Sequence, residues 1–254
     1  MTPRRPDCRR FEPLMLALAL AAALVAGCAS PRTGDDLAVP PQPDTQAQGE
    51  HMAITGTRWV WAAATTAAGR GGPPPDQLFW IHFEDAQRAS VQADCNRGFA
   101  EIRVASGGLS FPRVAVTRRA CGTRSLDDRF VRLLEAVTGA YIEDGRLKMT
   151  LAPAMAGPAG IIEFRRMTPT PYVCDDEQRF VAWAIAGSPD LVFEIEGRSS
   201  RLNRTTSGAG LRYESAIASG ETPIEFRAEG RAATASGPGF ALGRCRMAPT
   251  AQAW

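Results

Sequence analysis

Six cysteines are the residues whose type and spacing most clearly suggest chemistry in this chain: Cys8, Cys28, Cys95, Cys121, Cys174 and Cys245. Cys28 follows a basic segment at residues 4–10 and an unbroken apolar run from Leu14 to Ala26, which is the order of a secretory signal. The run is shorter than the ~20 apolar residues of a membrane-spanning helix. We therefore predict a signal peptide over residues 1–27, with cleavage before Cys28.

The residues around this cleavage point indicate a lipid anchor. Leu24-Val25-Ala26-Gly27-Cys28 resembles the bacterial lipobox, in which the cysteine sulfur takes a diacylglycerol and the cysteine becomes the new N-terminus. Buried acyl chains contribute ~0.8 kcal/mol per CH₂, which holds a protein to a bilayer. Ala29 follows in place of the aspartate of inner-membrane lipoproteins, so the resemblance implies an outer-membrane lipoprotein facing the periplasm. An ordinary signal peptide with an incidental cysteine and a twin-arginine signal at Arg9-Arg10 are the alternatives.

The four other cysteines after residue 28 form an even set in a chain bound for an oxidising compartment, which favours disulfides. Four cysteines allow three pairings, and we favour Cys95–Cys121 with Cys174–Cys245, because each bridge then stays inside one half of the chain. A four-cysteine zinc site is the alternative, but no Cys-x-x-Cys spacing supports it.

Charge and histidine content narrow the function. The formal charge is +2, and after removal of residues 1–27 the charges cancel, which argues against nucleic-acid binding. His51 and His82 are the two histidines, too few for a multi-histidine metal cage. His82 lies among Trp80, Ile81 and Phe83, and the sequence places no nucleophile beside it. We expect a protein without a metal or cofactor that is not an enzyme.

Two proline-rich segments divide the mature chain. Residues 28–51 contain the lipidated cysteine and then Pro31, Pro40, Pro41 and Pro43 among polar neighbours, and they are typical of a tether. Thr168-Pro169-Thr170-Pro171 is expected to interrupt both sheet and helix. We place the domain boundary there, giving domains at residues 52–168 and 172–247.

The first domain is expected to be α+β. Leu78 to Phe83 and Ala100 to Val104 have the pattern of strands. An amphipathic helix is expected after a capping pair of Ser125 and Asp128, with its end at Gly139 and an apolar face that comprises Phe130, Leu133, Leu134 and Val137. Ala140 to Glu143, the Asp144-Gly145 turn and Arg146 to Leu151 predict a hairpin.

The second domain is expected to be a small all-β antiparallel barrel. Leu191, Phe193 and Ile195 alternate along one strand, and Gly197 turns the chain into Arg198 to Leu202. Further strands are expected at 179–186, 211–215, 224–228 and 239–245. Many short strands within fewer than about a hundred residues, joined by one disulfide, are typical of a barrel.

The first domain resembles the META, or HslJ-like, family over nearly all of its length. The resemblance rests on Trp59, on Asp94-Cys95-Asn96-Arg97-Gly98, on Thr117-Arg118-Arg119-Ala120-Cys121, and on the helix and strands that follow. It implies an α+β domain of bacterial envelope proteins linked to stress and drug tolerance. Asn96 is expected to form an Asx-type turn that fixes the loop beside the disulfide, and a ligand-contacting turn is the alternative.

The second domain resembles the C-type lysozyme inhibitor family, called MliC-like, from Tyr172 to about Arg246. Tyr172-Val173-Cys174-Asp175 is similar to the family's opening motif, and Cys245 to its closing half-cystine. The segment Ser207-Gly208-Ala209-Gly210-Leu211-Arg212-Tyr213 is similar to its loop, and Phe226-Arg227-Ala228-Glu229-Gly230 stands where the family has Phe-Trp-x-Lys-Gly. The resemblance implies that the loop enters the active-site cleft of a C-type lysozyme.

Two positions depart from that family. A plug for a cleft with a neutral acid and an ionised carboxylate should present a hydroxyl and a cation, but here Ala209 replaces the hydroxyl and Glu229 the cation. Ser207 and one of Arg212, Arg227 or Arg231 are the possible substitutes. We expect a lipid-anchored envelope protein that binds C-type lysozyme, and a non-inhibitory envelope stress or scaffold lipoprotein is the alternative.

Overall fold

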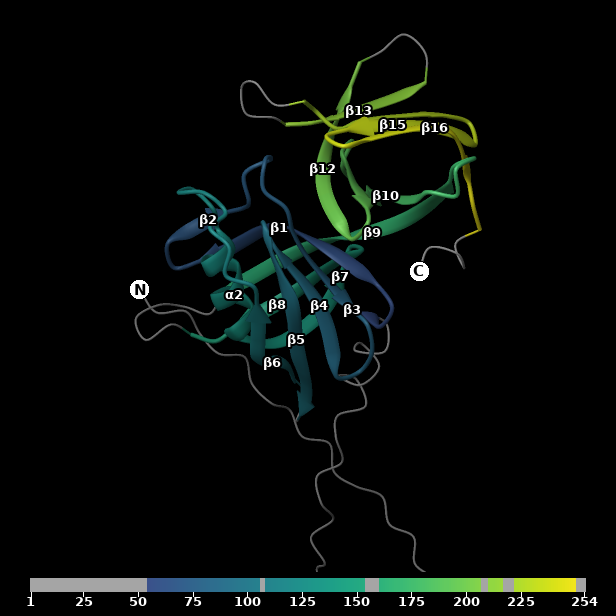
Figure 1. The fold of residues 1–254 in the computed structure, drawn as a ribbon. Helices are drawn as coiled ribbons and strands as arrows, with labels where there is room; N and C mark the ends of the chain where they lie inside the picture. Colours follow the sequence, from purple (N-terminus) through teal and green to yellow (C-terminus); the bar gives the residue numbers. More distant parts are fainter. Residues whose placement is uncertain (1–53, 106–107, 154–159, 207–209, 217–221, 250–254) are drawn as a thin grey trace, which may run out of the picture. The chain divides into compact units, whose positions relative to one another are not determined.

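Antiparallel strands make up most of the computed structural model, which describes residues 54–105, 108–153, 160–206, 210–216 and 222–249 (Figure 1). By their contacts, the residues of these ranges all belong to one compact unit. The elements of the described part are β1 (Arg58–Thr66), β2 (Gly69–Gly71), β3 (Phe79–Phe83), β4 (Arg88–Ala93), β5 (Asn96–Ala105), β6 (Gly108–Val116), α2 (Asp127–Glu135), β7 (Val137–Glu143), β8 (Arg146–Leu151), β9 (Ile161–Val173), β10 (Arg179–Ile185), β11 (Leu191–Ile195), β12 (Arg198–Thr205), β13 (Leu211–Ser215), β14 (Glu225–Glu229), β15 (Ala232–Gly237) and β16 (Phe240–Met247).

Strand β9 belongs to two sheets at once. Its first half pairs with β1 and β8, in the order β7-β8-β9-β1-β3-β4-β5-β6, which we call the N-terminal sheet. Its second half pairs with β10 on one side and β16 on the other, and this closes an eight-stranded antiparallel barrel of β9 to β16. The expected small antiparallel barrel is therefore confirmed (Figure 1).

The expected interruption of the sheet at Thr168 to Pro171 is wrong, because β9 runs through both prolines. Pro169 and Pro171 are paired with Trp183 and Val181 of β10. The carbonyl of Pro171 accepts a hydrogen bond from Ala248 N at 2.9 Å, so this residue's missing N–H also faces away from β10. On that side β16 ends at Met247, opposite Tyr172, so Pro171 interrupts neither the pairs with β16 nor the ladder with β10. The division into residues 52–168 and 172–247 remains a prediction about which parts fold on their own.

Each sheet encloses a core of aromatic and aliphatic side chains. In the N-terminal sheet, Phe130 of α2 stacks on Trp61 with ring centres 5.4 Å apart. In the barrel, the ring centres of Phe193 and Phe226 lie 6.1 Å apart. A third cluster joins the two cores at β9 and comprises Val60, Leu78, Trp80, Met167, Trp183, Ile185 and Val192. Hydrophobic burial therefore continues across the shared strand.

The helix is shorter than expected at both ends. Leu126 occupies the N-cap position without a side-chain capping bond, and the helix ends at Glu135 with Ala136 as its C-cap. The hydroxyl of Ser125, one residue earlier, accepts the backbone N–H of Asp127, the first helical residue, at 3.3 Å and donates to Asp94 at 2.7 Å. Val137, expected on the helix, is the first residue of β7. The apolar spacing was correct for the buried helical residues, but Val137 reaches the same core from a strand.

The hairpin turns and the disulfides follow the sequence expectations. Asp144-Gly145 joins β7 to β8 with φ of 51° and 70°, and Glu196-Gly197 joins β11 to β12 with φ of 48° and 71°. Positive φ at both positions is the geometry that a tight two-residue hairpin turn requires. The bridges are Cys95–Cys121 and Cys174–Cys245, as predicted. Because all four sulfurs are used in these bonds, they form no zinc site.

Within the described ranges, none of the helices has the length and apolar character needed to cross a bilayer.

Candidate functional site

The predicted lysozyme-binding segment falls on the hairpin of β13 and β14 and on the turn after it. The strands pair with Arg212 opposite Arg227 and Tyr213 opposite Phe226. Because successive side chains alternate between the two faces of a strand, the arginine pair lies outside the barrel and the aromatic pair inside. The structure thus separates residues that the sequence motif placed together.

Four of the predicted residues line one hollow at the surface of the barrel. This hollow has a volume of about 570 Å³, and its lining includes Gly210, Arg212, Arg227 and Glu229. Leu211 also lines it and is 41% exposed. An exposed leucine in a hollow that charged side chains also line is apolar surface that a protein partner can cover.

Two glycines of this region have different roles. Gly210 has φ of +74°, and a Cβ atom there would lie 3.0 Å from the carbonyl oxygen of Ala228. Gly230 has φ of +57° in the turn between β14 and β15, with open space around it. Both positions favour glycine for its backbone freedom, but at Gly210 the approach of the neighbouring strand also restricts the side chain.

The two arginines of the hollow are balanced by carboxylates. Arg212 lies 2.5 Å from Glu214 and 3.1 Å from Glu225, and Arg227 lies 3.1 Å from the other oxygen of Glu225. The hydrogen bond from Arg227 and the charge of Arg212 hold the pKa of Glu225 below its ordinary value. Neither arginine is therefore a ready counter-ion for a carboxylate of a partner.

Arg231 is the third arginine considered as a substitute cation. It is an exposed turn residue between β14 and β15, beside Glu229 and Gly230. Among the residues that the structure describes, no carboxylate forms an ion pair with it. Of the three arginines, Arg231 is thus the one whose charge is open to a partner.

Tyr213 lies in the barrel core. It is 9% exposed, and its ring centre lies 5.9 Å from that of Phe226. Phe226 in turn contacts Tyr172, the first residue of the family-like motif, at 5.7 Å. These three aromatic residues are a packing unit that positions the hairpin.

Some of the predicted site residues lie outside the part that the structure describes. They are Cys28, the predicted lipidation site, and Ser207, Gly208 and Ala209 of the predicted loop.

The Asn96 side chain connects the start of β5 to the segment before α2 by hydrogen bonds. Its side chain is 2% exposed. The amide nitrogen donates to Arg119 O at 3.1 Å and to Asp127 at 2.9 Å, while Oδ1 accepts from Thr117 at 2.9 Å and from Arg119 N at 2.7 Å. Because both ends of the amide are engaged, this geometry favours the expected role in fixing the loop beside Cys121 over the ligand-contacting alternative.

His82 lies on β3 and is half-buried. Burial and, next, the positive charge of Arg58 lower its pKa, while Glu84 and Glu194 act in the opposite direction. In the described part of the chain, no three His, Cys, Asp or Glu side chains are grouped as a metal site.

One arginine that sequence reasoning missed joins the two sheets. Arg58 is 6% exposed and forms an ion pair with Glu194 of β11. Its guanidinium lies 4.2 Å from the ring centre of Trp80 and 4.0 Å from that of Trp183. A charged residue directly before the apolar run from Trp59 to Ala64 was the available signal, and its partner lies 136 positions away.

The described residues therefore define an antiparallel β protein in which a sheet with one helix shares a strand with a closed barrel. Residues 52–158 match the META domain family. This confirms the META-like part of the sequence interpretation. An NMR structure of a protein from Burkholderia xenovorans is 25% identical and aligns over 55% of this chain and 99% of that chain, with a TM-score of 0.39. The comparison with curated proteins gives no match.

Proposed function

We propose that this protein is a lipid-anchored envelope lipoprotein whose barrel binds a C-type lysozyme through the hollow beside β13 and β14. The supporting observation is the convergence of Gly210, Arg212, Arg227 and Glu229, predicted from two separate motifs, on one surface hollow. The closed barrel and its Cys174–Cys245 bridge are also those that the family resemblance implies.

The proposal assigns the cation to Arg231. Arg212 and Arg227 share Glu225, so presenting either one to a lysozyme carboxylate would require breaking an existing ion pair. Arg231 is exposed at the neighbouring turn and needs no such exchange. A cation is required there because one carboxylate of the lysozyme cleft is ionised.

The test is lysozyme-driven lysis of peptidoglycan with and without the soluble 29–254 chain. Dose-dependent inhibition is expected, together with direct binding of the lysozyme to the immobilised chain. Arg231→Ala should weaken binding by about tenfold, the equivalent of ~1.4 kcal/mol. Arg179→Ala is the matched control, because Arg179 is exposed on β10, on the opposite side of the β9 to β16 strand order from β14.

A second candidate function is a non-inhibitory envelope stress or scaffold role, and a specific observation favours it. Glu214 and Glu225 neutralise the arginine pair, and the exposed Glu229 adds a negative charge to the hollow. A like charge against a buried carboxylate costs several kcal/mol. If the native chain does not inhibit but the double variant Ala209→Ser plus Glu229→Lys does, the barrel has lost this target and the second function is the better one.

The proposed location has its own test. Lipidation at Cys28 should place the protein in the outer-membrane fraction and allow labelling with radioactive palmitate. Cys28→Ser should abolish the label and release the protein into the periplasmic fraction. Labelling that persists in this variant would contradict the proposed anchor site.

A further inference from the structure

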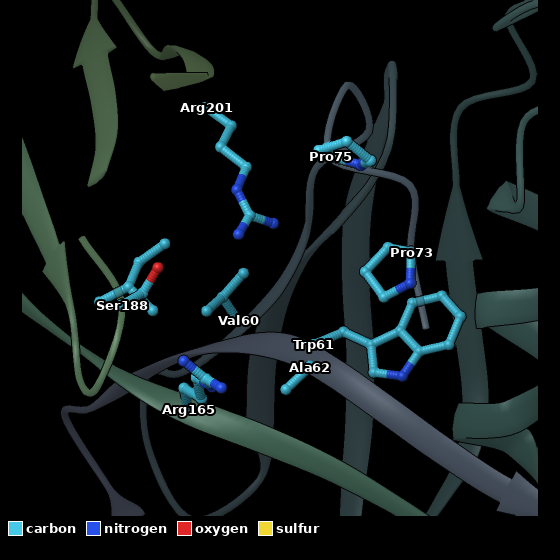
Figure 2. Close-up of a pocket in the computed structure, with 9 residues that line it drawn as sticks. Val60, Trp61, Ala62, Pro73, Pro75, Arg165, Ser188 and Arg201 are labelled. Carbon is cyan, nitrogen blue, oxygen red and sulfur yellow. The ribbon is translucent and has the colours of Figure 1, made fainter. Parts of the chain in front are cut away.

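A second hollow lies where β1, β9, β12 and the turn after β10 meet, on elements other than those of the proposed lysozyme site. It has a volume of about 320 Å³, near the lower end of the range for small-molecule sites. The guanidinium groups of Arg165 and Arg201 enter from opposite sides, and Ser188 lies beside them (Figure 2). Val60, Ile185 and Pro73 supply apolar lining.

The two arginines leave unused donors and charge. Arg165 donates to the backbone carbonyl of Gly187 at 2.5 Å, and among the described residues no carboxylate forms an ion pair with it. Arg201 forms an ion pair with Asp190 at 3.1 Å. Its Nε atom is buried and has no hydrogen-bond partner in the described part of the chain. A buried donor without an acceptor is uncommon in proteins, so Arg201 has a hydrogen-bonding capacity that its contacts with Asp190 do not use.

The charges specify the ligand. Two guanidinium groups and the Asp190 carboxylate leave one net positive charge at this hollow. A carboxylate matches that charge, and its planar pair of oxygens fits the donor fork of arginine. A phosphate dianion would leave an excess of negative charge.

We propose that this hollow binds small monocarboxylates, with the carboxylate between Arg165 and Arg201 and an apolar body against Val60 and Ile185. Benzoate is a suitable probe because it combines one carboxylate with a flat apolar ring. Benzamide has nearly the same shape without the charge, and phenyl phosphate offers the other oxyanion.

The experiment titrates each probe into the 29–254 chain, which contains the whole compact unit, and follows backbone amide signals by NMR. Benzoate should bind saturably and shift the signals of Gly187 and Ser188. Benzamide should bind at least about tenfold more weakly, because it lacks the charge. Equal binding of benzamide, tighter binding of phenyl phosphate, or shifts confined to other residues would overturn the assignment.

Arg165→Gln should raise the dissociation constant for benzoate at least about tenfold. Arg166→Gln is the matched control, because Arg166 is an exposed neighbour on the same strand, and it should leave the constant unchanged. If Arg165→Gln does not fold, Arg165→Lys keeps the charge and should retain measurable binding that weakens with added salt. Unchanged affinity in Arg165→Gln, or insensitivity of Arg165→Lys binding to salt, contradicts the proposal.

Discussion

Arg58 of the N-terminal sheet forms an ion pair with Glu194 of the barrel, between the indole rings of Trp80 and Trp183. The Arg58 and Glu194 side chains are only 6% and 22% exposed, so both charges are largely removed from water. Each buried charge is therefore stabilised mainly by its partner in the ion pair. The contact also adds a polar link between two sheets that already share β9.

Glu194→Gln should reduce the free energy of unfolding by about 3 kcal/mol, because it leaves the buried guanidinium of Arg58 without its counter-ion. Glu196→Gln is the matched control. Its ion pair with Arg198 is exposed, at 71% and 70%, and its loss should cost less than ~1 kcal/mol. Urea unfolding followed by tryptophan fluorescence measures both variants. If the two variants lost the same free energy of unfolding, the buried ion pair of Arg58 would stabilise the protein no more than an exposed one does.

Fragments cut at different points of β9 should differ in whether they fold. A fragment of residues 172–247 lacks Met167 to Pro171, which pair with β10, and should show no cooperative urea transition. Residues 161–249 contain the whole shared strand and should unfold cooperatively as a closed barrel. Circular dichroism during urea titration provides the measurement. A cooperative transition in the shorter fragment would support the predicted boundary instead.

The N-terminal sheet should depend on β9 in the same way. Ile162 and Phe164 are fully buried in its core but lie beyond residues 52–158, the part that matches the META domain family. Residues 52–158 alone should therefore expose apolar surface and bind a hydrophobic dye such as ANS, whereas residues 52–173 should not. Equal dye binding by the two fragments would contradict this dependence.

Stability should depend on pH through His82. Burial and Arg58 lower its pKa in the folded protein, so the unfolded chain, with a histidine pKa of ~6.5, binds the proton more readily. The stabilising contribution is fully present above pH ~6.5 and is lost as pH falls from there towards the folded-state pKa. His82→Gln should flatten the dependence below pH ~6.5, measured by urea unfolding at each pH. His51 is present in the wild-type protein and in His82→Gln, so it cannot cause a difference in pH dependence between them.

Asn96→Ala should destabilise the protein by about 2 kcal/mol, because it removes the four hydrogen bonds by which the buried Asn96 side chain holds Thr117, Arg119 and Asp127. Asn96→Asp keeps acceptors for Thr117 but sets a second carboxylate against Asp127. Its loss of stability should therefore be smaller at acid pH, where one carboxyl is protonated, than at neutral pH. Thermal unfolding of both variants at pH 4 and pH 7 tests this difference.

Local features could be predicted from the sequence where one residue type has a strong conformational preference. Gly145 and Gly197 marked tight turns, and cysteine spacing indicated both disulfides. Strand β15, Ala232–Gly237, was not predicted, because its small residues carry no strong strand pattern. Its neighbours on both sides of the barrel determine its conformation.

Features that depend on distant partners could not be predicted in this way. The prolines of β9 are tolerated because of the direction in which their nitrogen atoms face, and that direction is decided by β10. The charges of Arg212 and Arg227 were recognised, but their neutralisation by Glu225 depends on strand register. Sequence motifs therefore contained four residues that line one hollow, but they could not show which charges are already paired.

The position of β9 also governs the order in which the chain can fold. Trp59 of β1 pairs with Arg166 of β9, so β1 cannot complete its pairing until a strand roughly a hundred residues later has been synthesised. Until that partner arrives, apolar residues such as Trp61 and Phe79 have an incomplete core, and such intermediates are prone to aggregate. A chain exported from its N-terminus would therefore have most of the N-terminal sheet across the membrane before that sheet could close.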